Sequence, residues 1–257
     1  MKFNYKKSLG QNFLMDKNKI KQIVDVIDVN EKDLIVEIGP GAGAITREII
    51  KKNSAVICFE IDTRLEKELS KIKSSKLNIV YKDFLKINLY DYIDYSKYNK
   101  IVFVGNLPYY ITTAIINKII EYNFADEIII MVQKEVAERF MAKPNSKKYN
   151  SLSIFLQYQF DIKKVCDVSK NCFEPIPKVD STVIKFVKNK KYKVNNEEVF
   201  YKLIKDSFRQ KRKNLRNNLK TYDLNKIEKI LNQINKDLTF RAENLSIDDF
   251  ILISNNI

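Results

Sequence analysis

The sequence predicts an α/β fold: a mostly parallel sheet of about seven strands, covered by helices and followed by a small all-α C-terminal domain. Two observations carry this prediction. Short apolar runs alternate with amphipathic stretches over the first 190 residues, which is the pattern of a parallel sheet with helices on its faces. After a charged connector at about 188–198, only helical patterns follow. We therefore expect one domain over residues 1–190 and a second over 191–257.

The predicted strands are short apolar runs, and the predicted helices lie between them. Runs with the length of buried strands occur at 34–38, 55–61, 78–82, 100–104 and 127–132. Two further extended segments are expected near 153–166 and 180–187. Helical patterns occur at about 44–52, 64–73, 112–122 and 133–140. Thr112 or Thr113 can cap the third of these helices. Because strands and helices alternate, neighbouring strands are expected to run parallel.

The composition limits the chemistry that the protein can perform. With 257 residues, 45% of them hydrophobic, the chain is long and apolar enough for a packed core. The formal net charge of +14 indicates a polyanionic partner such as nucleic acid, although a lysine-rich proteome would give the same charge. The absence of histidine excludes every mechanism that needs an imidazole, including serine and cysteine triads.

The number of cysteines and the length of the apolar runs indicate the cellular compartment of the protein. Cys58, Cys166 and Cys172 are too few and too scattered for a zinc site, so no metal is expected. An odd number of cysteines, without the apolar stretch of a secretory signal, fits a reducing cytoplasm. No apolar run approaches the roughly 20 residues that a membrane span needs. We therefore expect a cytoplasmic protein without a membrane partner. A monomer is expected as well, although the sequence says little about oligomeric state.

The few glycines are concentrated near unusual sequences. Gly39, Gly41 and Gly43 lie in one turn, and Gly10 and Gly105 immediately precede the stretches QNFL and NLPYY. Glycine is needed where the backbone angle φ is positive or where a ligand approaches the backbone closely. Any single one of them could be an ordinary turn residue, but together they predict the position of a binding site.

A strand, a glycine-rich turn and a helix follow one another over residues 34–44. In such a turn, backbone N–H groups and a helix N-terminus can meet a ligand. Glu60 ends the next strand, 21 residues beyond Gly39, where a carboxylate can accept hydrogen bonds from both hydroxyls of an adenosine ribose. Asp83 closes the third strand and either accepts from an adenine amino group or caps the following helix.

The turn by itself is compatible with two cofactors. Gly39-x-Gly41-x-x-Ala44 satisfies the dinucleotide fingerprint of NAD enzymes as well. Glu37 at the end of the strand and Pro40 between the glycines favour S-adenosylmethionine. A carboxylate there suits a cationic amino-acid ligand and would repel a pyrophosphate.

The loop Asn106-Leu107-Pro108-Tyr109 is the most specific chemical signal in the chain. It follows the fourth strand, and so is expected at the carboxyl edge of the sheet beside the glycine turn. An adenine N6 amine is a poor nucleophile, and two acceptors for its hydrogens help it towards tetrahedral geometry. The Asn106 side-chain oxygen and the Leu107 carbonyl can supply them, while Tyr109 offers a stacking face. This chemistry needs no histidine.

Several motifs together carry a resemblance to one family. In order, they are Gln11–Leu14, Glu37–Gly43, Glu60–Asp62, Asn106–Tyr109, Met131–Arg139 and Phe173–Ser181. Over about residues 8–187 the chain resembles the KsgA family of ribosomal RNA adenine dimethyltransferases. The resemblance implies a Rossmann-like class I methyltransferase domain and a small helical domain. It also implies N6 dimethylation of two adjacent adenosines near the 3′ end of small-subunit ribosomal RNA, on the pre-ribosomal small subunit.

The resemblance also implies residue roles. The positions implied for binding S-adenosylmethionine are Asn12, Leu14, Gly39, Glu60, Asp83 and Asn106. Those implied for the target amine and base are Asn106, Leu107, Tyr109 and Phe173. Tyr110 departs from the family, which usually has a smaller polar residue there, and this affects the shape expected for the base pocket.

The C-terminal segment is basic. Residues 191–257 hold 14 basic and 9 acidic residues, a net charge of +5, and 202–220 carry eight Lys or Arg against Asp206 alone. Apolar residues recur there at helical spacing. This predicts a helical region with one apolar face that packs on the main domain and one basic face that binds RNA phosphates.

Three other functions are compatible with the sequence. One is a dimethyltransferase of the antibiotic-resistance type that acts on large-subunit RNA. The second is an NAD-dependent oxidoreductase, which would leave the NLPY loop and the basic charge unexplained. The third is a ribosome-assembly factor in which RNA binding matters more than catalysis.

Overall fold

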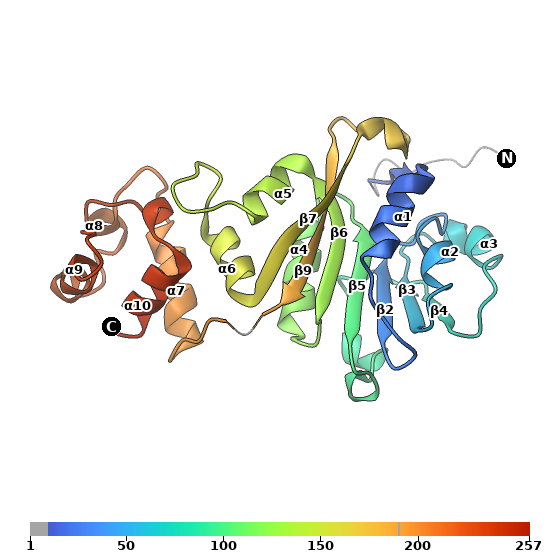
Figure 1. Ribbon diagram of the computed structural model, residues 1–257, viewed down its shortest axis with the longest axis horizontal. Coiled ribbons are helices and arrows are strands. Elements are labelled where there is room, and N and C mark those ends of the chain that lie inside the picture. Colours follow the sequence, from blue (N-terminus) through green and yellow to red (C-terminus); the bar gives the residue numbers. More distant parts are fainter. Residues whose placement is uncertain (1–9, 190) are drawn as a thin grey trace. The chain divides into compact units, whose positions relative to one another are not determined.

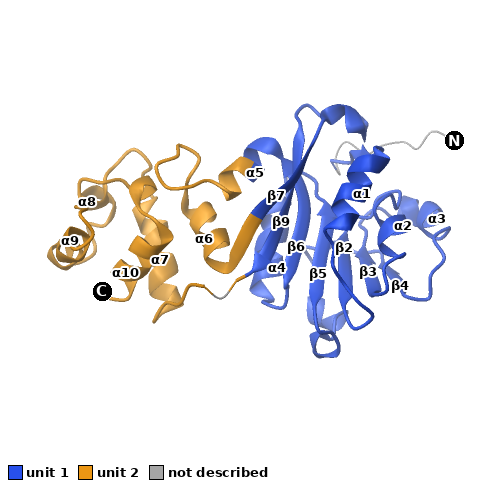
Figure 2. Ribbon diagram, in the orientation of Figure 1, with its two compact units in different colours: residues 1–137, 163–188 blue, residues 138–162, 189–257 orange. Residues whose placement is uncertain are grey.

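The computed structural model describes residues 10–189 and 191–257, which form two compact units (Figure 1). The first unit consists of Met1–Ala137 with Lys163–Lys188, and the second of Glu138–Ile162 with Asn189–Ile257 (Figure 2). Residues 1–9 and 190, where the sequence places the start of the motif-bearing region and the domain boundary, lie outside the described residues.

The main sheet of the described chain has seven strands, as the sequence predicts. In spatial order they are β4 (Leu77–Val80), β3 (Ala55–Phe59), β2 (Leu34–Ile38), β5 (Ile101–Asn106), β6 (Glu127–Gln133), β9 (Ser181–Lys188) and β7 (Phe160–Val168). The pairs from β4 through β6 are parallel, and β9 runs antiparallel to β6. The mostly parallel sheet is therefore confirmed.

The central strands are buried along almost their whole length. Every residue of β2 is buried, and β5 and β6 are exposed only partly and only at their last residues. Val102, Val104 and Ile129 pack together with Ile35 in the core of the first unit. Continuous apolar runs are typical of parallel strands that are covered on both faces, which is why these strands could be predicted from the sequence.

Helices of the first unit connect the strands and are shorter than predicted. They are α1 (Lys17–Asp25), α2 (Thr46–Ile49), α3 (Glu66–Leu69), α4 (Thr112–Glu121) and α5 (Lys134–Phe140), the last of which continues into the second unit. In the segment predicted as a helix at 44–52, i→i+3 bonds such as Glu48 to Ile45 mix with i→i+4 bonds. The segment is therefore mostly turn, with a single regular helical turn at α2.

The N-terminal part adds two elements that were not predicted. Asp16 caps α1 by accepting from the N–H groups of Asn18 and Lys19. Just before it, β1 (Phe13–Leu14) pairs antiparallel with β8 (Phe173–Glu174) in a separate two-stranded sheet. We call residues 10–16 the strap: they include β1, and the Phe13 ring lies against Gly41 of the glycine turn.

The second unit is helical. Its helices are α6 (Ser151–Gln159), α7 (Glu197–Ser207), α8 (Leu215–Asn218), α9 (Leu224–Asn232) and α10 (Ile247–Ser254). Its core contains Phe200, Leu203 and Phe250 from the C-terminal helices, together with Tyr149 and Ile154 from the segment Glu138–Ile162.

The second part of the extended segment predicted at 153–166 is confirmed by β7, but its first part is helical, and the single boundary predicted at residue 190 differs from the division into two units. Residues 151–159 form α6, because Asn150 and Ser153 make a capping box at its start. Residues 138–162 group with the C-terminal helices, because Tyr149 and Ile154 bury their side chains among them. The connector marks only one of the three places where the chain passes between units.

Candidate active site

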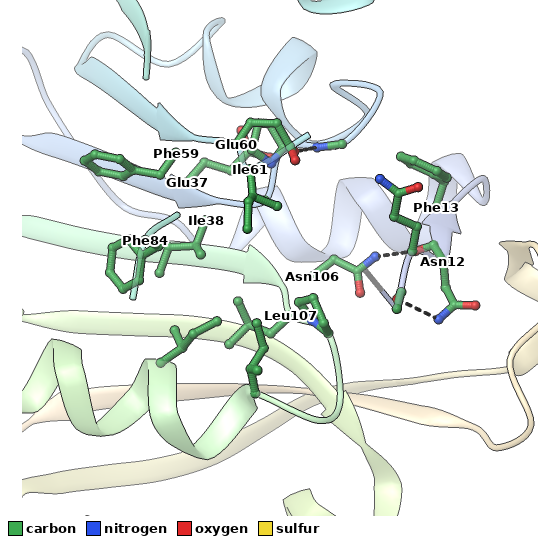
Figure 3. Close-up of a pocket in the computed structure, with 18 of the residues that line it drawn as sticks. Asn12, Phe13, Glu37, Ile38, Phe59, Glu60, Ile61, Phe84, Asn106 and Leu107 are labelled. Carbon is green, nitrogen blue, oxygen red and sulfur yellow. Dashed lines mark hydrogen bonds between the residues drawn. The ribbon is translucent and has the colours of Figure 1, made fainter. Parts of the chain in front are cut away.

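A pocket lies at the carboxyl edge of the sheet, where the segments after β2, β3, β4 and β5 come together (Figure 3). Of the residues that the sequence assigns to the site, those that line it are Asn12, Leu14, Gly39, Glu60, Asp83, Asn106, Leu107 and Tyr109. Strap residues, separated from the β5 loop by more than 90 positions, line the same pocket. The predicted convergence of the glycine turn and the NLPY loop is therefore present in the fold.

The glycine turn has the geometry that its residues suggested. Gly39 has φ +69° and Gly41 has φ +58°, values that other residues rarely adopt. A Cβ on Gly39 would meet nothing within 4 Å, so the backbone there faces open space. A Cβ on Gly41 would lie 2.7 Å from the Phe13 ring, so glycine at 41 lets the strap pack closely against the turn.

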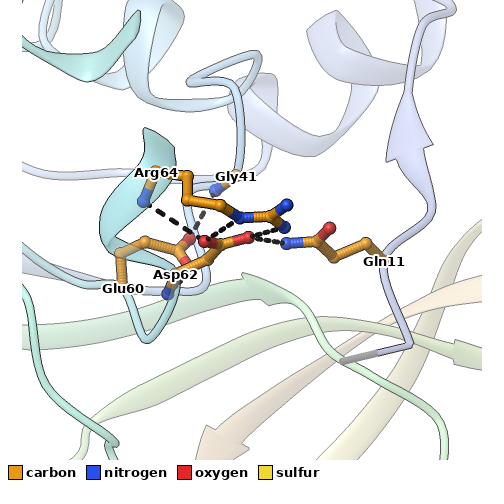
Figure 4. Close-up of polar contacts among 5 residues, drawn as sticks. All are labelled: Gln11, Gly41, Glu60, Asp62 and Arg64. Atoms are coloured by element: carbon orange, nitrogen blue, oxygen red, sulfur yellow. Dashed lines mark hydrogen bonds and ion pairs between the residues drawn. The ribbon is translucent and has the colours of Figure 1, made fainter. Parts of the chain in front are cut away.

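Glu60 is held in place before any ligand binds. Its side chain is only 4% exposed, and its Oε2 accepts from the Gly41 N–H at 3.0 Å. Its Oε1 accepts from the Asp62 N–H at 2.8 Å (Figure 4). Burial raises the pKa of Glu60, while these two N–H groups act in the opposite direction. Both carboxylate oxygens keep lone pairs for further donors.

Asp62 anchors the strap beside Glu60, a role that the sequence analysis missed. Its Oδ2 accepts from Gln11 Nε2 at 2.7 Å, and Arg64 forms a fork, with Nε to Oδ1 at 2.8 Å and Nη2 to Oδ2 at 2.6 Å (Figure 4). The Arg64 guanidinium lowers the pKa of Asp62 to about 2. The available signal was the motif Glu60-Ile61-Asp62, but nothing local shows that Gln11 lies opposite it.

Asn106 has its amide group oriented by the strap. Its Nδ2 donates to the backbone oxygen of Asn12 at 2.7 Å. Figure 3 shows the Asn106 side-chain oxygen turned away from Asn12. The Asn12 side chain itself donates to the Gly10 carbonyl at 3.2 Å. In the structure, Asn12 therefore acts on Asn106 through its backbone, while its amide group holds the strap.

The rest of the NLPY loop is closely packed. A Cβ on Gly105 would lie 2.8 Å from both the Ile38 oxygen and the Leu107 side chain, so glycine is required by close approach. The Tyr109 hydroxyl lies 2.7 Å from the Ser181 hydroxyl, which is fully buried on β9. Ser181 is a second missed contact, and it stands at the end of the motif Phe173–Ser181. Tyr110, the departure from the family, is 66% exposed.

Phe173 is the one predicted site residue that does not line the pocket. Its side chain is 3% exposed and packs in the core of the first unit, in the same cluster as Leu14. The register of the small sheet places Leu14 directly opposite Phe173. The ring is therefore part of the packing that holds the strap.

Asp83 combines the two roles that the sequence left open. It lines the pocket, and its Oδ1 accepts from the Leu85 N–H at 3.0 Å in the turn after β4. The side chain thus caps its own turn with Oδ1, while Oδ2 lies 3.9 Å from Lys86 Nζ in a long ion pair.

Comparison with known proteins shows the family of the chain. The model of the ribosomal RNA adenine dimethylase family matches residues 2–257. The chain belongs to this family. Among its relatives, the ribosomal RNA small subunit methyltransferase A of Fusobacterium nucleatum is 44% identical, over 98% of this chain and 97% of the relative. That of Mycoplasmopsis pulmonis is 43% identical, over 95% and 96%.

Solved structures agree with this assignment. A dimethyladenosine transferase from Plasmodium falciparum is 25% identical, with a TM-score of 0.79 over 94% of this chain and 95% of that one. The 23S rRNA methyltransferase ErmE shares the fold, at 22% identity and a TM-score of 0.77 over 95% and 99%. The family resemblance and the Rossmann-like class I methyltransferase fold predicted from the sequence are confirmed, and the protein is an rRNA adenine dimethyltransferase by family.

Neither a metal cluster nor a membrane-spanning helix occurs among the described residues. Within 10–189 and 191–257, no group of three or more Cys, Asp or Glu side chains could hold a metal ion. The helices of the same ranges include none that is long and apolar enough to cross a membrane.

Glu37 is the most deeply buried carboxyl group that lines the pocket. It is 1% exposed, and its Oε2 accepts from Thr46 Oγ1 at 2.7 Å and from Cys58 Sγ at 3.4 Å. Burial raises the pKa of Glu37 from 4.5 to about 7. The carboxyl group is therefore partly protonated near neutral pH, and a neighbouring cation would favour its charged form.

Glu37→Gln is expected to change how stability depends on pH. Because the folded-state pKa is raised, Glu37 stabilises the fold most below pH 4.5, and this contribution is lost as the pH rises through 7. The loss amounts to about 3 kcal/mol, and a glutamine does not titrate. Urea unfolding at pH 5 and pH 8 should show a smaller decrease for the variant than for the wild type. Exposed Glu31→Gln is the control, and parallel profiles for Glu37→Gln would contradict the assignment.

Proposed function

We propose that this protein transfers methyl groups from S-adenosylmethionine to the N6 amino groups of two adjacent adenosines near the 3′ end of small-subunit ribosomal RNA. The observation that carries the proposal is the orientation of the Asn106 amide, whose Nδ2 donates a hydrogen bond to the Asn12 carbonyl. Asn106 and Glu60 line the same pocket. Family membership and the names of the small-subunit relatives support the substrate.

The residues of the pocket fit an adenosyl cofactor. The Glu60 carboxylate is fixed by two N–H groups and retains lone pairs for the ribose hydroxyls. The open space beside Gly39 leaves room for a ligand against the backbone. Phe59 and Phe84 line the pocket and provide apolar walls for a base. When bound, S-adenosylmethionine supplies an electrophilic methyl group on a sulfonium.

In this proposal the loop residues bind and orient the target base. The side-chain oxygen of Asn106 and the backbone oxygen of Leu107 accept the two hydrogens of the adenine amine. Tyr109 stacks on the base, with its hydroxyl held by Ser181. A histidine base is not required, because holding the amine in line with the methyl group supplies most of what the reaction needs.

Phe173 is retained as a second contact for the base on the family resemblance alone. Its ring is 3% exposed, so contact requires the pairing of β1 with β8 to shift. The assignment of Asn12, Leu14 and Asp83 to the cofactor rests on their place in the pocket lining.

The two predicted domains have separate tasks in the proposal. The region 1–190, apart from the segment 138–162, carries methyl transfer, and the basic helical region 191–257 binds RNA phosphates. A small-subunit rRNA substrate is also the reason to propose the pre-ribosomal small subunit as partner and the cytoplasm as location. We also propose that the protein acts as a monomer.

The alternatives are less well supported. The relatives are named as small-subunit methyltransferases, which argues against the large-subunit type. Membership of a methyltransferase family argues against an NAD-dependent oxidoreductase. Transfer of tritiated methyl groups to unmethylated small and large ribosomal particles tests the proposal. Labelled dimethyladenosine in small-subunit RNA is expected. Label in large-subunit RNA would favour the resistance type, and no label in either particle would contradict the proposal.

A triple replacement of Lys211, Arg212 and Lys213 by alanine is expected to weaken RNA binding without changing base selectivity. These three residues are exposed in the turn between α7 and α8. For each phosphate that is no longer neutralised by a basic side chain, the slope of log affinity against log salt should fall by about 0.7 on single strands. Filter binding from low to high salt measures this slope.

The matched control for that variant removes three lysines that already form ion pairs. Lys21, Lys51 and Lys71 each pair with an acidic residue three or four positions away on the surface of the first unit. Their triple alanine variant should keep the wild-type slope. An unchanged slope in the 211–213 variant would mean that those residues only face solvent.

A further inference from the structure

Lys118 connects the helix after the NLPY loop to the segment after β4. It lies on α4, twelve residues beyond Asn106 in the sequence. Its Nζ donates to the Leu85 carbonyl at 3.0 Å and also to the Ile87 carbonyl. The same Nζ lies 5.7 Å from the centre of the Phe84 ring, within the range of a cation–π contact. One side chain therefore contacts three residues of a single loop.

That loop, residues 83–87, is a wall of the pocket. Asp83, Phe84 and Leu85 all line it. Phe84 is 5% exposed, and its ring packs edge-on against Phe59, which lines the pocket from β3, with 5.6 Å between ring centres. The aromatic pair gives the wall an apolar surface of the kind that accepts a flat base.

The loop has little regular structure of its own. Besides the contacts with Lys118, the N–H of Leu85 donates to Asp83 Oδ1 and the N–H of Lys86 donates to the Asp83 backbone oxygen, and Lys86 Nζ lies 3.9 Å from Asp83 Oδ2. The carbonyls of Leu85 and Ile87 point to Lys118 and belong to no strand or helix. Burial lowers the pKa of Lys118, and the carboxylates of Asp83 and Glu121 oppose this shift. The amine group with its several donors can satisfy both carbonyls at once.

We propose that Lys118 is a positioning residue that holds the wall formed by residues 83–87 in the shape that receives the adenine end of the cofactor. The inference rests on the proposed function, since it takes S-adenosylmethionine as the ligand. Because α4 begins at Thr112, shortly after the NLPY loop, Lys118 also connects the wall for the cofactor to the helix that follows the target-base residues. Nothing in the motif pattern of the sequence singles Lys118 out.

The experiment compares Lys118→Met with a matched lysine. Lys188 also donates to two oxygens, those of the Asn123 backbone and side chain at 2.6 and 2.8 Å, and it does not line the pocket. Titration calorimetry with S-adenosylhomocysteine and with 5′-methylthioadenosine, which retains adenine and ribose but lacks the amino-acid part, measures affinity directly. Lys118→Met should bind both ligands about tenfold more weakly, which corresponds to a loss of about 1.4 kcal/mol in binding free energy.

Steady-state kinetics separate positioning from catalysis. In Lys118→Met the KM for S-adenosylmethionine should rise about tenfold, while kcat at saturation stays within about twofold of the wild type. Lys118→Arg should recover part of the affinity, because a guanidinium can donate to both carbonyls. The only effect expected of Lys188→Met is a lower melting temperature. Its affinities for both ligands should equal those of the wild type. If Lys118→Met does not fold, Lys118→Gln is used instead. Its affinity for both ligands should be lower than that of the wild type, by less than tenfold.

Each result bears on a different claim. A wild-type protein that binds neither ligand overturns both the proposed function and this inference. A wild type that binds, with a folded Lys118→Met of equal affinity, overturns the inference and leaves the proposed function standing. Equal decreases of melting temperature in the two lysine variants, without a change in affinity, also overturn it, because Lys118 would then only support the fold.

Discussion

Asn106→Ala is expected to lower kcat about 100- to 1,000-fold, a decrease of the size seen when one directional hydrogen-bonding group of a reacting centre is removed. RNA affinity should stay within about twofold, because the basic second unit and the loop aromatics are unchanged. The reason is the geometry of the amide group. Its nitrogen is held at 2.7 Å from the Asn12 carbonyl, so its oxygen is available to the target amine. Methyl transfer with both substrates saturating, together with RNA binding, measures the two quantities.

Asn53→Ala is the control for Asn106→Ala. Asn53→Ala removes an exposed asparagine that contacts Glu31 and Lys76, and it should leave kcat unchanged. Near-normal turnover of Asn106→Ala would show that the amine acceptors lie outside the loop. In cells, small subunits that assemble normally with an inactive Asn106→Ala protein would favour the assembly-factor function.

Glu60→Ala is expected to weaken binding of S-adenosylhomocysteine by about 100-fold or more. Two charge-assisted hydrogen bonds to the ribose are removed, each contributing about 1.5–3 kcal/mol. The same change removes the acceptor for the N–H groups of Gly41 and Asp62, so the carboxylate no longer shapes the glycine turn. Titration calorimetry gives the affinity directly.

Glu60→Gln separates these contributions, because the amide keeps one acceptor oxygen and should lose less affinity than alanine. Glu31→Ala, an exposed carboxylate, should bind as the wild type does. Unchanged binding in Glu60→Ala would remove Glu60 from the cofactor site. Tight binding of NAD by the wild type, without a response to S-adenosylhomocysteine, would contradict the choice of cofactor itself.

The strands and the positions that directly follow them could be predicted from the sequence. The runs at 34–38 and 127–132 are continuous and apolar because both faces of those strands are covered, and such runs are visible without an alignment. Gly39, Glu60 and Asn106 end or follow such strands, so their meeting at one edge of the sheet follows from parallel topology. Residues 153–159, the first part of the segment predicted as extended, form a helix, for which Asn150 and Ser153 carry a capping signal.

What the sequence determined by itself was therefore the order of strands and turns, the family and the residues that stand at the carboxyl edge of the sheet. The tertiary structure alone decided which groups meet across the chain. The bond from Asn106 to Asn12 joins residues 94 positions apart, that from Gln11 to Asp62 spans 51, and Lys118 reaches Leu85 from 33 positions away. The physical reason is that hydrophobic periodicity and turn chemistry act within a few residues. The partner of a side chain across the chain is set only when the register of the strands and the packing of the helices are in place.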